Sequence, residues 1–403
     1  MTADRPRAWD GRYEWRAIAL LSAGFGLVGL DRFIILPLFP LMMRDLNLDY
    51  QDLGLTASVF SLAWGLSALV TGRLSDRIGR RRTLIPAVVV FSLLACGSGL
   101  ATGLAGLLFI RALMGLSEGA YTPASIAAAA EASKPSRRGF NLGIQQDLYA
   151  ILGLGLGPIL ATQLLGVVPS WRYVFALVSL PGFVLAYAMH RGLRDTQGTL
   201  AVAASPTTRG AWREIFAHRN VPLNMAGMCF MLSCLLIVTT MAPNYLVDVL
   251  HLDLGHMGFV LSSMGLGGFI GQLVLPALSD RIGRKAVVLI CYAATLASLV
   301  VFLRLGAAPW PLFAALFSIS FFTNSMICLN VGPLTSEAVP AALTATATGV
   351  VVGTGELLGG GLAPGLAGYV AKHFGLGHAI ELALLGLALG FVTACFLRET
   401  RPA

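Results

Sequence analysis

The chain has 403 residues, of which 56% are hydrophobic and only 12% are charged. Soluble domains are about a quarter charged, and a buried core could not take up so large an apolar excess, so this composition excludes a soluble protein. The net charge of +8 would suit a nucleic-acid binder. Most arginines, however, lie in short gaps between long apolar runs, a pattern typical of membrane proteins, so we expect no nucleic-acid partner.

A membrane-spanning helix needs about 20 mostly apolar residues, and twelve such segments follow one another along the chain. The first six are Ala17–Met42, Leu53–Gly72, Thr83–Ala101, Leu104–Ala130, Phe140–Val168 and Tyr173–Met189. A polar stretch, His190–Asn220, separates them from the rest. The last six are Val221–Val249, Met257–Leu278, Ala286–Leu303, Trp310–Pro333, Ala342–Val370 and Ala379–Phe396. The first run is too long for a signal peptide and is taken as a span.

The distribution of positive charge orients these spans. If the N-terminus is cytoplasmic, the cytoplasmic segments hold 22 Lys and Arg residues and the opposite side holds four. Because positive charge concentrates on the cytoplasmic side, we expect both termini in the cytoplasm and a multi-pass protein of the cell (inner) membrane, surrounded by lipid. The expected domains are an N-terminal six-helix bundle over 1–191, a cytoplasmic linker over 192–220 and a C-terminal bundle over 221–403.

The cysteines carry no sign of a metal site or a disulfide framework. All six lie inside apolar runs, with no C-x-x-C pair and no histidine at ligand spacing, so we interpret them as small buried side chains. They are Cys96, Cys229, Cys234, Cys291, Cys328 and Cys395. We expect no metal and no cofactor.

An internal repeat divides the chain into two related halves. The segment Leu74–Arg80, LSDRIGR, recurs letter for letter at Leu278–Arg284, 204 residues later, each time between the second and third span of its half. Glu131 and Glu337 also occupy equivalent positions in the two halves, each at the cytoplasmic end of the fourth span. Repeated halves around a site near the membrane centre are typical of secondary transporters.

The repeated segment, read from Gly72 to Arg82, resembles the signature loop of the major facilitator superfamily, although Pro276 replaces the leading glycine in the second copy. The resemblance implies twelve helices in two pseudo-symmetric bundles. It also implies a gate on the cytoplasmic side, held by Asp–Arg pairing and by the end of the fourth helix. The gate residues would be Gly72, Asp76, Arg77, Gly79, Arg80 and Glu131, with Asp280, Arg281, Gly283, Arg284 and Glu337 in the second half.

Four charged residues lie inside the first bundle, where ionisable groups are costly and usually functional. Asp31 and Arg32 stand about 22 Å along the first span, and Arg111 stands about 10 Å below the outer end of the fourth, at a similar depth. Glu118 follows Arg111 by seven residues on the same helix face. Adjacent Asp31 and Arg32 point about 100° apart, so we expect their partners on the fourth helix.

This cluster suggests a coupling between protons and an anion. Arginine stays charged, whereas a carboxylate removed from water takes up a proton more readily. Protonating Asp31 and Glu118 would leave Arg32 and Arg111 free for a carboxylate guest. Binding of the proton and of the anion would then help each other reciprocally.

The Asp31-Arg32 pair, together with Arg111-Ala-Leu-Met-Gly-Leu-Ser-Glu118-Gly119, resembles the anion:cation symporter group of this superfamily. The resemblance implies that Arg32 binds the substrate carboxylate and that the acids on the first and fourth helices carry protons. The same pattern also resembles spinster-like lysolipid transporters, so it does not fix the substrate. A buried structural charge network is the remaining alternative for these four residues.

Further candidates are weaker. Trp64 lies too deep for an interfacial anchor and either stacks on substrate or packs in the core. Glu356, among glycines in the eleventh span, is either a second protonation site or a packing acid. The polar residues that remain as candidate substrate contacts are Tyr121, Gln145, Asn324 and Tyr245.

The sequence thus predicts a proton-coupled importer of a small organic anion, most simply a carboxylate, that works as a monomer. The alternative on the same fold is a proton-linked exporter of drugs or lipids. Paired arginines in the pocket argue against a cationic substrate but not against a lipid. A membrane enzyme or a receptor is disfavoured because no gap between spans exceeds about 30 residues and no nucleophile–base pair is present.

Overall fold

The computed structural model describes residues 10–194, 214–340 and 343–400, without the side-chain surroundings of Gly72, Arg73, Asp76 and Ala345. Regular structure in these ranges is helical throughout, and twelve helices are long and apolar enough to cross a membrane. The predicted fold class, an all-α protein with twelve spans, is therefore confirmed. Most of the predicted linker lies outside the described residues.

The first half supplies six spans, two of them built from more than one helix. The first joins two helices at Ile34, and the fifth contains a π-helical segment, η2. Its elements are α1 (Gly11–Phe33), α2 (Ile35–Leu46), α3 (Tyr50–Ile78), α4 (Arg80–Ser98), α5 (Leu104–Ala132), η1 (Pro135–Arg137), α6 (Arg138–Tyr149), η2 (Ala150–Leu156), α7 (Gly157–Leu165) and α8 (Trp171–Gly192).

The second half repeats this plan, with π-helical segments in its first and fifth spans. Its elements are α10 (Asn220–Asn244), η3 (Tyr245–Val249), α11 (Leu254–Ile282), α12 (Arg284–Arg304), α13 (Pro309–Val331), α14 (Pro333–Ser336), α15 (Thr344–Thr354), η5 (Gly355–Gly360), α16 (Ala363–Phe374) and α17 (Leu376–Cys395). Single π turns inside helices are frequent at functional sites, and η5 carries Glu356.

Polar residues outside the apolar runs decide where several spans begin and end. Asp49 starts α3 with a capping box, accepting hydrogen bonds from the backbone N–H groups of Gln51 and Asp52. The glycines of the repeated motif, Gly79 and Gly283, have φ of 98° and 102°. Only glycine adopts this conformation easily, which explains why both copies turn from one span into the next at a glycine.

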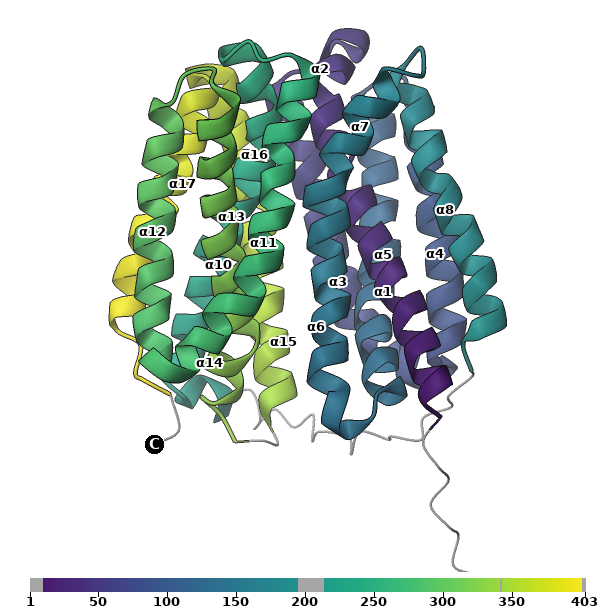
Figure 1. Ribbon diagram of the computed structural model, residues 1–403, viewed down its shortest axis with the longest axis vertical. Coiled ribbons are helices and arrows are strands. Elements are labelled where there is room, and N and C mark those ends of the chain that lie inside the picture. The colour runs from purple at the N-terminus through teal and green to yellow at the C-terminus, as the bar shows by residue number, and fades with distance from the viewer. Residues whose placement is uncertain (1–9, 195–213, 341–342, 401–403) are drawn as a thin grey trace, which may run out of the picture.

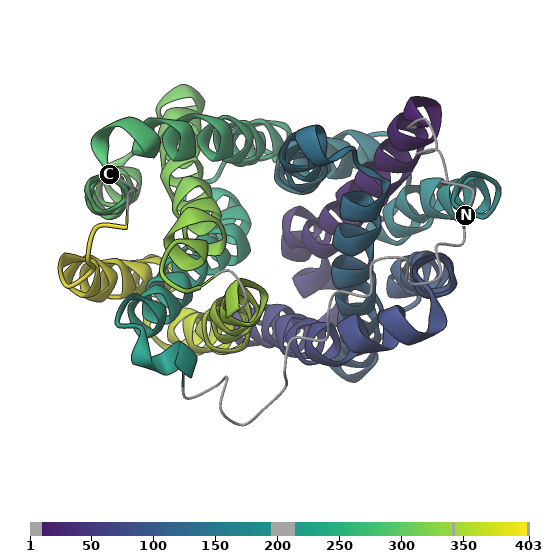
Figure 2. The ribbon, with the colours of Figure 1, turned by 90° about the horizontal axis from the view of Figure 1, so that it is seen from below.

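The helices form two groups, seen end-on in Figure 2. In the first, α3 and α4 pack on α5, and α1 packs on α6 and η2. In the second, α11 and α12 pack on α13, and α10 packs on α17. The beginning of α1 and the end of α17 lie at the bottom of Figure 1, which we call the terminal side; the opposite side is the far side.

The two halves contact each other mainly through helices on the far side. There α3 packs on α16, α11 packs on α7 and η2, and α2 packs on α10 (Figure 1). Glycines make the approach close: a Cβ added to Gly265 would lie 2.2 Å from the Cα of Gly155 in the other half. Small residues of this kind allow helix backbones to meet inside a membrane. The far side is therefore closed.

Gly54 gives a direct test of this closure. A Cβ added there would lie 2.3 Å from the backbone oxygen of Pro364 across the interface, so we expect Gly54→Ala to push α3 away from α16. Pulsed electron paramagnetic resonance between spin labels on exposed Arg44 and His373 should then show longer distances. Gly97→Ala is the matched control, because nothing lies within 4 Å of its added Cβ. An unchanged distance distribution in Gly54→Ala would contradict the packing described here.

Candidate functional site

The four intramembrane charges of the first half lie deep inside its bundle. Asp31 and Arg32 stand at the end of α1, just before the break at Ile34, and Arg111 and Glu118 stand on α5. Their exposed fractions range from 0% to 8%. Burying four charged groups is costly without partners, so their hydrogen bonds determine what the site can do.

Arg32 is the best-connected member of the cluster. Its guanidinium donates to the hydroxyl of Tyr149 on α6 at 3.2 Å and to Ser61 Oγ on α3 at 3.1 Å. It also forms an ion pair with Glu356 Oε2 on η5, at 3.3 Å. Glu356 belongs to the other half of the chain. The expectation that Arg32 finds its partner on the fourth helix was wrong, because the end of α1 lies against the boundary between the halves.

Arg111 is less well satisfied. Its Nη1 donates to the backbone oxygen of Asp31 at 3.2 Å, which brings α5 and α1 together as expected. Its Nε and Nη2, one carboxylate oxygen of Asp31 and both oxygens of Glu118 have no hydrogen-bond partner among the described residues. Glu118 nevertheless lies within electrostatic range of Asp31, Arg111 and Arg32. Buried groups with open hydrogen-bonding capacity are available to water, a proton or a ligand.

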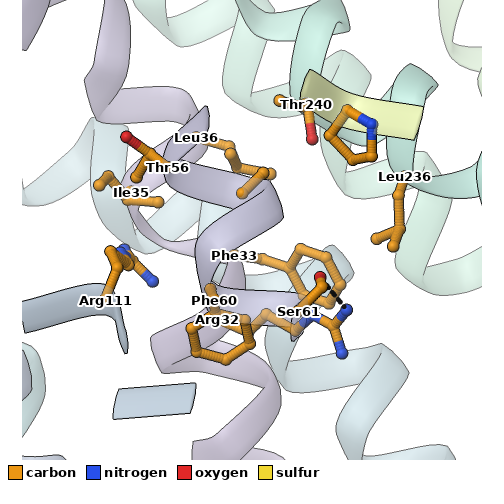
Figure 3. Close-up of a pocket in the computed structure, with 12 residues that line it drawn as sticks. Arg32, Phe33, Ile35, Leu36, Thr56, Phe60, Ser61, Arg111, Leu236 and Thr240 are labelled. Atoms are coloured by element: carbon orange, nitrogen blue, oxygen red, sulfur yellow. Dashed lines mark hydrogen bonds between the residues drawn. The ribbon is translucent and has the colours of Figure 1, made fainter. Parts of the chain in front are cut away.

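A small cavity opens beside the two arginines (Figure 3). Arg32 and Arg111 both line it, and the other half contributes Leu236, Thr240 and Pro364. The free space is about 20 Å³, which holds a water molecule but no organic solute. Asp31 and Glu118 do not line the cavity, so the structure brings together the two arginines there but not all four charges.

Aromatic rings surround the guanidinium groups. The Cζ atom of Arg32 lies 5.3 Å from the ring centroid of Phe60, and that of Arg111 lies 5.8 Å from the same ring. Phe33 and Trp64 are 5.7 Å and 5.9 Å from Arg32. Trp64 thus lies beside Arg32 without lining the cavity, and its indole N–H has no hydrogen-bond partner among the described residues. The sequence analysis missed Phe60, which stands one helical turn before Trp64 on the same face of α3.

The remaining candidates are held by local contacts. Tyr121 is fully buried in the first bundle, where its hydroxyl donates to the backbone oxygen of Leu21 at 3.1 Å. Tyr245 packs on Phe302 with a centroid distance of 5.6 Å. Neither lines the cavity in this state, because each ring fills a gap within its own bundle, and substrate contact at these two residues stays a prediction.

The two amides differ. The side-chain amide of Asn324 donates to the backbone oxygen and to the hydroxyl oxygen of Ser320 on the same helix, α13, each at 3.0 Å. Asn324 does not line the cavity in this state, and its contact with substrate stays a prediction. Gln145 on α6 donates to Ser125 at 3.0 Å, while its amide oxygen is buried without a partner. Gln145 therefore keeps a free acceptor one turn from Tyr149.

The repeated motif builds matching contacts on the terminal side of each half. Arg80 pairs with Glu131 at 3.2 Å, and Arg284 pairs with Glu337 at 2.8 Å and with Asp280 at 2.6 Å. All four motif arginines were expected at the gate, and the other two are Arg77 and Arg281. They are exposed, because the turns at Gly79 and Gly283 direct the next arginine toward the fourth span. The surroundings of Asp76 and Gly72 lie outside the described part of the chain.

Some contacts of these terminal-side clusters could not be foreseen. Glu399 accepts hydrogen bonds from the backbone N–H groups of Arg284 and Lys285 at 2.8 and 3.1 Å, and Thr400 donates to Glu337 at 3.0 Å. These residues tie the end of the chain to the second motif. Within the residues that the structure describes, no group of His, Cys, Asp and Glu is placed to hold a metal.

Twelve helices in two repeated halves, with buried arginines and carboxylates where the halves meet, define a membrane transporter. The chain matches the model of the Major Facilitator Superfamily over residues 21–364 and 257–403, and it belongs to that superfamily. Its fold and relatives are those of transporters, and it is not an enzyme.

Named relatives carry organic molecules. The chain is 27% identical to a probable 4-methylmuconolactone transporter of Cupriavidus pinatubonensis over 94% of this chain and 89% of the relative. It is also 27% identical to a hexuronate transporter of Bacillus subtilis, over 64% of this chain and 62% of the relative. A bacterial homologue of the human lysosomal transporter Spinster, solved in an inward-facing, unoccupied conformation, shares the fold with a TM-score of 0.79 at 16% identity, covering 96% of this chain and 98% of that one.

Proposed function

We propose that the protein is a proton-coupled symporter that takes up a small organic anion, with a carboxylate as the recognised group. The observation that carries this proposal is the ion pair between Arg32 and Glu356, which joins the two halves beside a cavity that Arg111 also lines. Relatives named for a hexuronate and a methylmuconolactone support an organic anion as the substrate class.

Substrate binding follows from the chemistry of Arg32. A guanidinium presents a fork that matches a carboxylate, and such pairs are strong in a site shielded from water. In the structure that fork is occupied by Glu356 at 3.3 Å. An incoming carboxylate must therefore displace an internal one, and the substrate competes with Glu356 for the same donor.

Proton coupling follows from what happens to the displaced acid. Glu356 is 7% exposed, and a buried carboxylate that loses its cation is stabilised by taking up a proton. The substrate anion and a proton thus arrive as a pair, and the charge beside Arg32 stays constant. We assign a second proton-binding role to Asp31 and Glu118, whose unpartnered oxygens face the electrostatic field of Arg111.

Transport itself would be a rocking of the two bundles, residues 1–191 and 221–403, around this pair. We place the terminal side in the cytoplasm of a cell (inner) membrane, because 22 of the 26 lysines and arginines outside the spans' interiors belong, by sequence, to the termini and to the connections that follow the even-numbered spans. The closed far side would then face outward, and the motif clusters at Arg80 and Arg284 would close the cytoplasmic side in the opposite state.

An ion pair on the far side tests how the outer closure responds to pH. Lys372 lies 2.7 Å from Asp49 across the two halves. Burial opposes the charge of Asp49, but hydrogen bonds from Lys372 and from the backbone N–H groups of Asp52 and Gln51 outweigh it and hold the pKa of Asp49 below its usual value. With a lowered pKa, the pair contributes fully from the ordinary carboxyl range up through neutral pH, where Lys372 is still charged, and on acidification it is lost as the pH falls through the lowered value.

We therefore expect Asp49→Asn to leave the pH profile of uptake between about pH 5 and 8 unchanged in shape. Asparagine still caps α3, and both side chains of the pair are partly exposed, so the rate should change by no more than about fivefold. Initial uptake rates across that pH range would measure this. A profile that flattens in Asp49→Asn would show that the outer pair, rather than the buried acids, senses the proton.

The deciding experiment is uptake into proteoliposomes. A panel of organic acids would be offered under an imposed pH gradient, acidic outside, and under no gradient. We expect gradient-driven accumulation of at least one acid, and loss of that accumulation in Glu118→Gln. Accumulation that ignores the gradient, or that Glu118→Gln leaves intact, would count against proton coupling. Efflux driven by the same gradient would instead identify an exporter.

A further inference from the structure

The residues that line the cavity indicate which class of carboxylic acid would bind, and this inference rests on the proposed transport of a carboxylate. Besides the two arginines, ten side chains in the described part of the chain line the cavity: three carry hydroxyl groups and seven are apolar. Among the residues that the structure describes, no acid and no amide lines it. The polar recognition that the cavity offers is thus concentrated at the two guanidinium groups, where a carboxylate would sit.

The three hydroxyl groups of the cavity wall add little hydrogen-bonding capacity for a polar substrate. Thr56 already donates to the backbone oxygen of Asp52 at 2.7 Å, and Ser61 already accepts from Arg32 at 3.1 Å. A sugar acid carries several hydroxyl groups, and each one that is buried without a partner weakens binding. Thr56 keeps its acceptor lone pairs, Ser61 keeps its proton and Thr240 makes no hydrogen bond to another described residue. Apart from the arginines, these three hydroxyl groups are the whole supply of partners that the described wall offers, so a polyhydroxylated body would leave several of its own groups unpaired.

An apolar, flat body suits this wall once the proposed rocking of the bundles has widened the cavity, which in the present state holds only a water molecule. The ring of Phe60 lies between the two arginines, with its centroid 5.3 Å from Arg32 and 5.8 Å from Arg111 (Figure 3). Leu236 approaches from the other half. A carboxylate held at Arg32 would place the atoms that follow it directly against the ring of Phe60. Aromatic rings prefer offset or edge contacts with other rings at this range.

We propose that the transported anion is a carboxylate with a flat aromatic or conjugated body, and that Phe60 is the residue that selects it. Phe60 contacts the body of the substrate while Arg32 holds its charge. Stacking on Phe60 favours a flat body over a saturated one, and the shortage of hydrogen-bond partners disfavours hydroxyl groups. These two preferences can be measured separately.

The test compares four probes that differ in one property at a time. Benzoate is a flat acid, cyclohexanecarboxylate is a saturated apolar acid, glucuronate is a hydroxylated ring acid and benzyl alcohol is a neutral flat molecule. Calorimetric binding to the purified full-length protein in lipid nanodiscs should rank benzoate first, by roughly tenfold over cyclohexanecarboxylate and more over glucuronate. In Phe60→Leu, benzoate should lose its advantage over cyclohexanecarboxylate.

A control variant separates selection from folding. Phe91→Leu alters a buried ring that packs on Tyr121 in the same bundle, away from the cavity, and it should keep the ranking. Glucuronate binding as tightly as benzoate, or Phe60→Leu weakening all acids equally, would overturn the proposal while leaving carboxylate transport intact. Benzyl alcohol binding as tightly as benzoate would instead overturn the proposed function, and this inference with it.

Discussion

An Arg32→Gln variant will bind the transported anion roughly 100-fold more weakly than the unaltered chain, or worse, because two charge-assisted hydrogen bonds to a carboxylate are lost. Arg32→Lys should recover only part of the affinity, since an ammonium keeps the charge but not the fork. Binding calorimetry and the concentration dependence of uptake measure both effects. Arg172→Gln is a suitable control, because Arg172 pairs with Asp45 on the far side and is 34% exposed.

Replacing Arg32 also leaves the buried carboxylate of Glu356 without its ion-pair partner. This effect on stability must be separated from the loss of anion binding. Removing one partner of a buried ion pair leaves an uncompensated charge and costs stability. The double variant Arg32→Gln with Glu356→Gln removes both charges, so its thermal stability should return toward that of the unaltered protein. Its anion affinity should not return. Recovery of binding in the double variant would show that Arg32 acts by holding the halves together, not by contacting the substrate.

The fold was predictable because its determinants are local. Runs of about 20 apolar residues dictate spans whatever their neighbours, and the exact repeat at Leu74 and Leu278 marks the two halves without any knowledge of packing. The limits of each span were harder to predict, because polar residues set them. Asp10 caps α1 by accepting from the backbone of Tyr13 at 3.0 Å, so the helix starts six residues before the apolar run at Ala17.

Those parts of the site that follow from the depth of a residue along a single helix could be predicted. Depth along α1 and α5 placed Asp31 and Arg111 at one level, and the structure joins them by a hydrogen bond of 3.2 Å. The partner of Arg32 could not be found in this way. Glu356 lies 324 residues further along the chain, and the contact exists only because η5 packs on α3. Pairing across two bundles depends on how they dock, which no periodicity encodes.

The direction in which the ring of Tyr121 points shows a second limit. Tyr121 follows Glu118 by three positions, so helical spacing alone places it near the charged face. Its ring turns toward α1, where Gly24 leaves room: a Cβ added to Gly24 would lie within 2.7 Å of two atoms of Tyr121. The glycine in one helix, and not the position in the other, decides that this ring fills the core.

Glu356→Gln separates substrate binding from proton coupling, and it is the variant with the most informative outcome. A neutral amide competes with the substrate for Arg32 less strongly than a carboxylate does, so the anion affinity at neutral pH should rise by roughly tenfold. The affinity should also lose much of its pH dependence. With no proton taken up at this position, accumulation driven by a pH gradient should fall sharply, while exchange of labelled for unlabelled anion across the membrane continues.

Exchange and accumulation must be measured on the same vesicles, so that a loss of accumulation alone can be distinguished from a loss of both activities. Glu381→Gln is the matched control, since Glu381 is an exposed acid on α17 of the same half, and it should leave both activities near those of the unaltered protein. Loss of exchange together with accumulation would mean that Glu356 is needed for the rocking motion itself. Full gradient-driven accumulation in Glu356→Gln would assign the coupled proton to Asp31 and Glu118 alone, and the ion pair with Arg32 would then serve only to join the two halves.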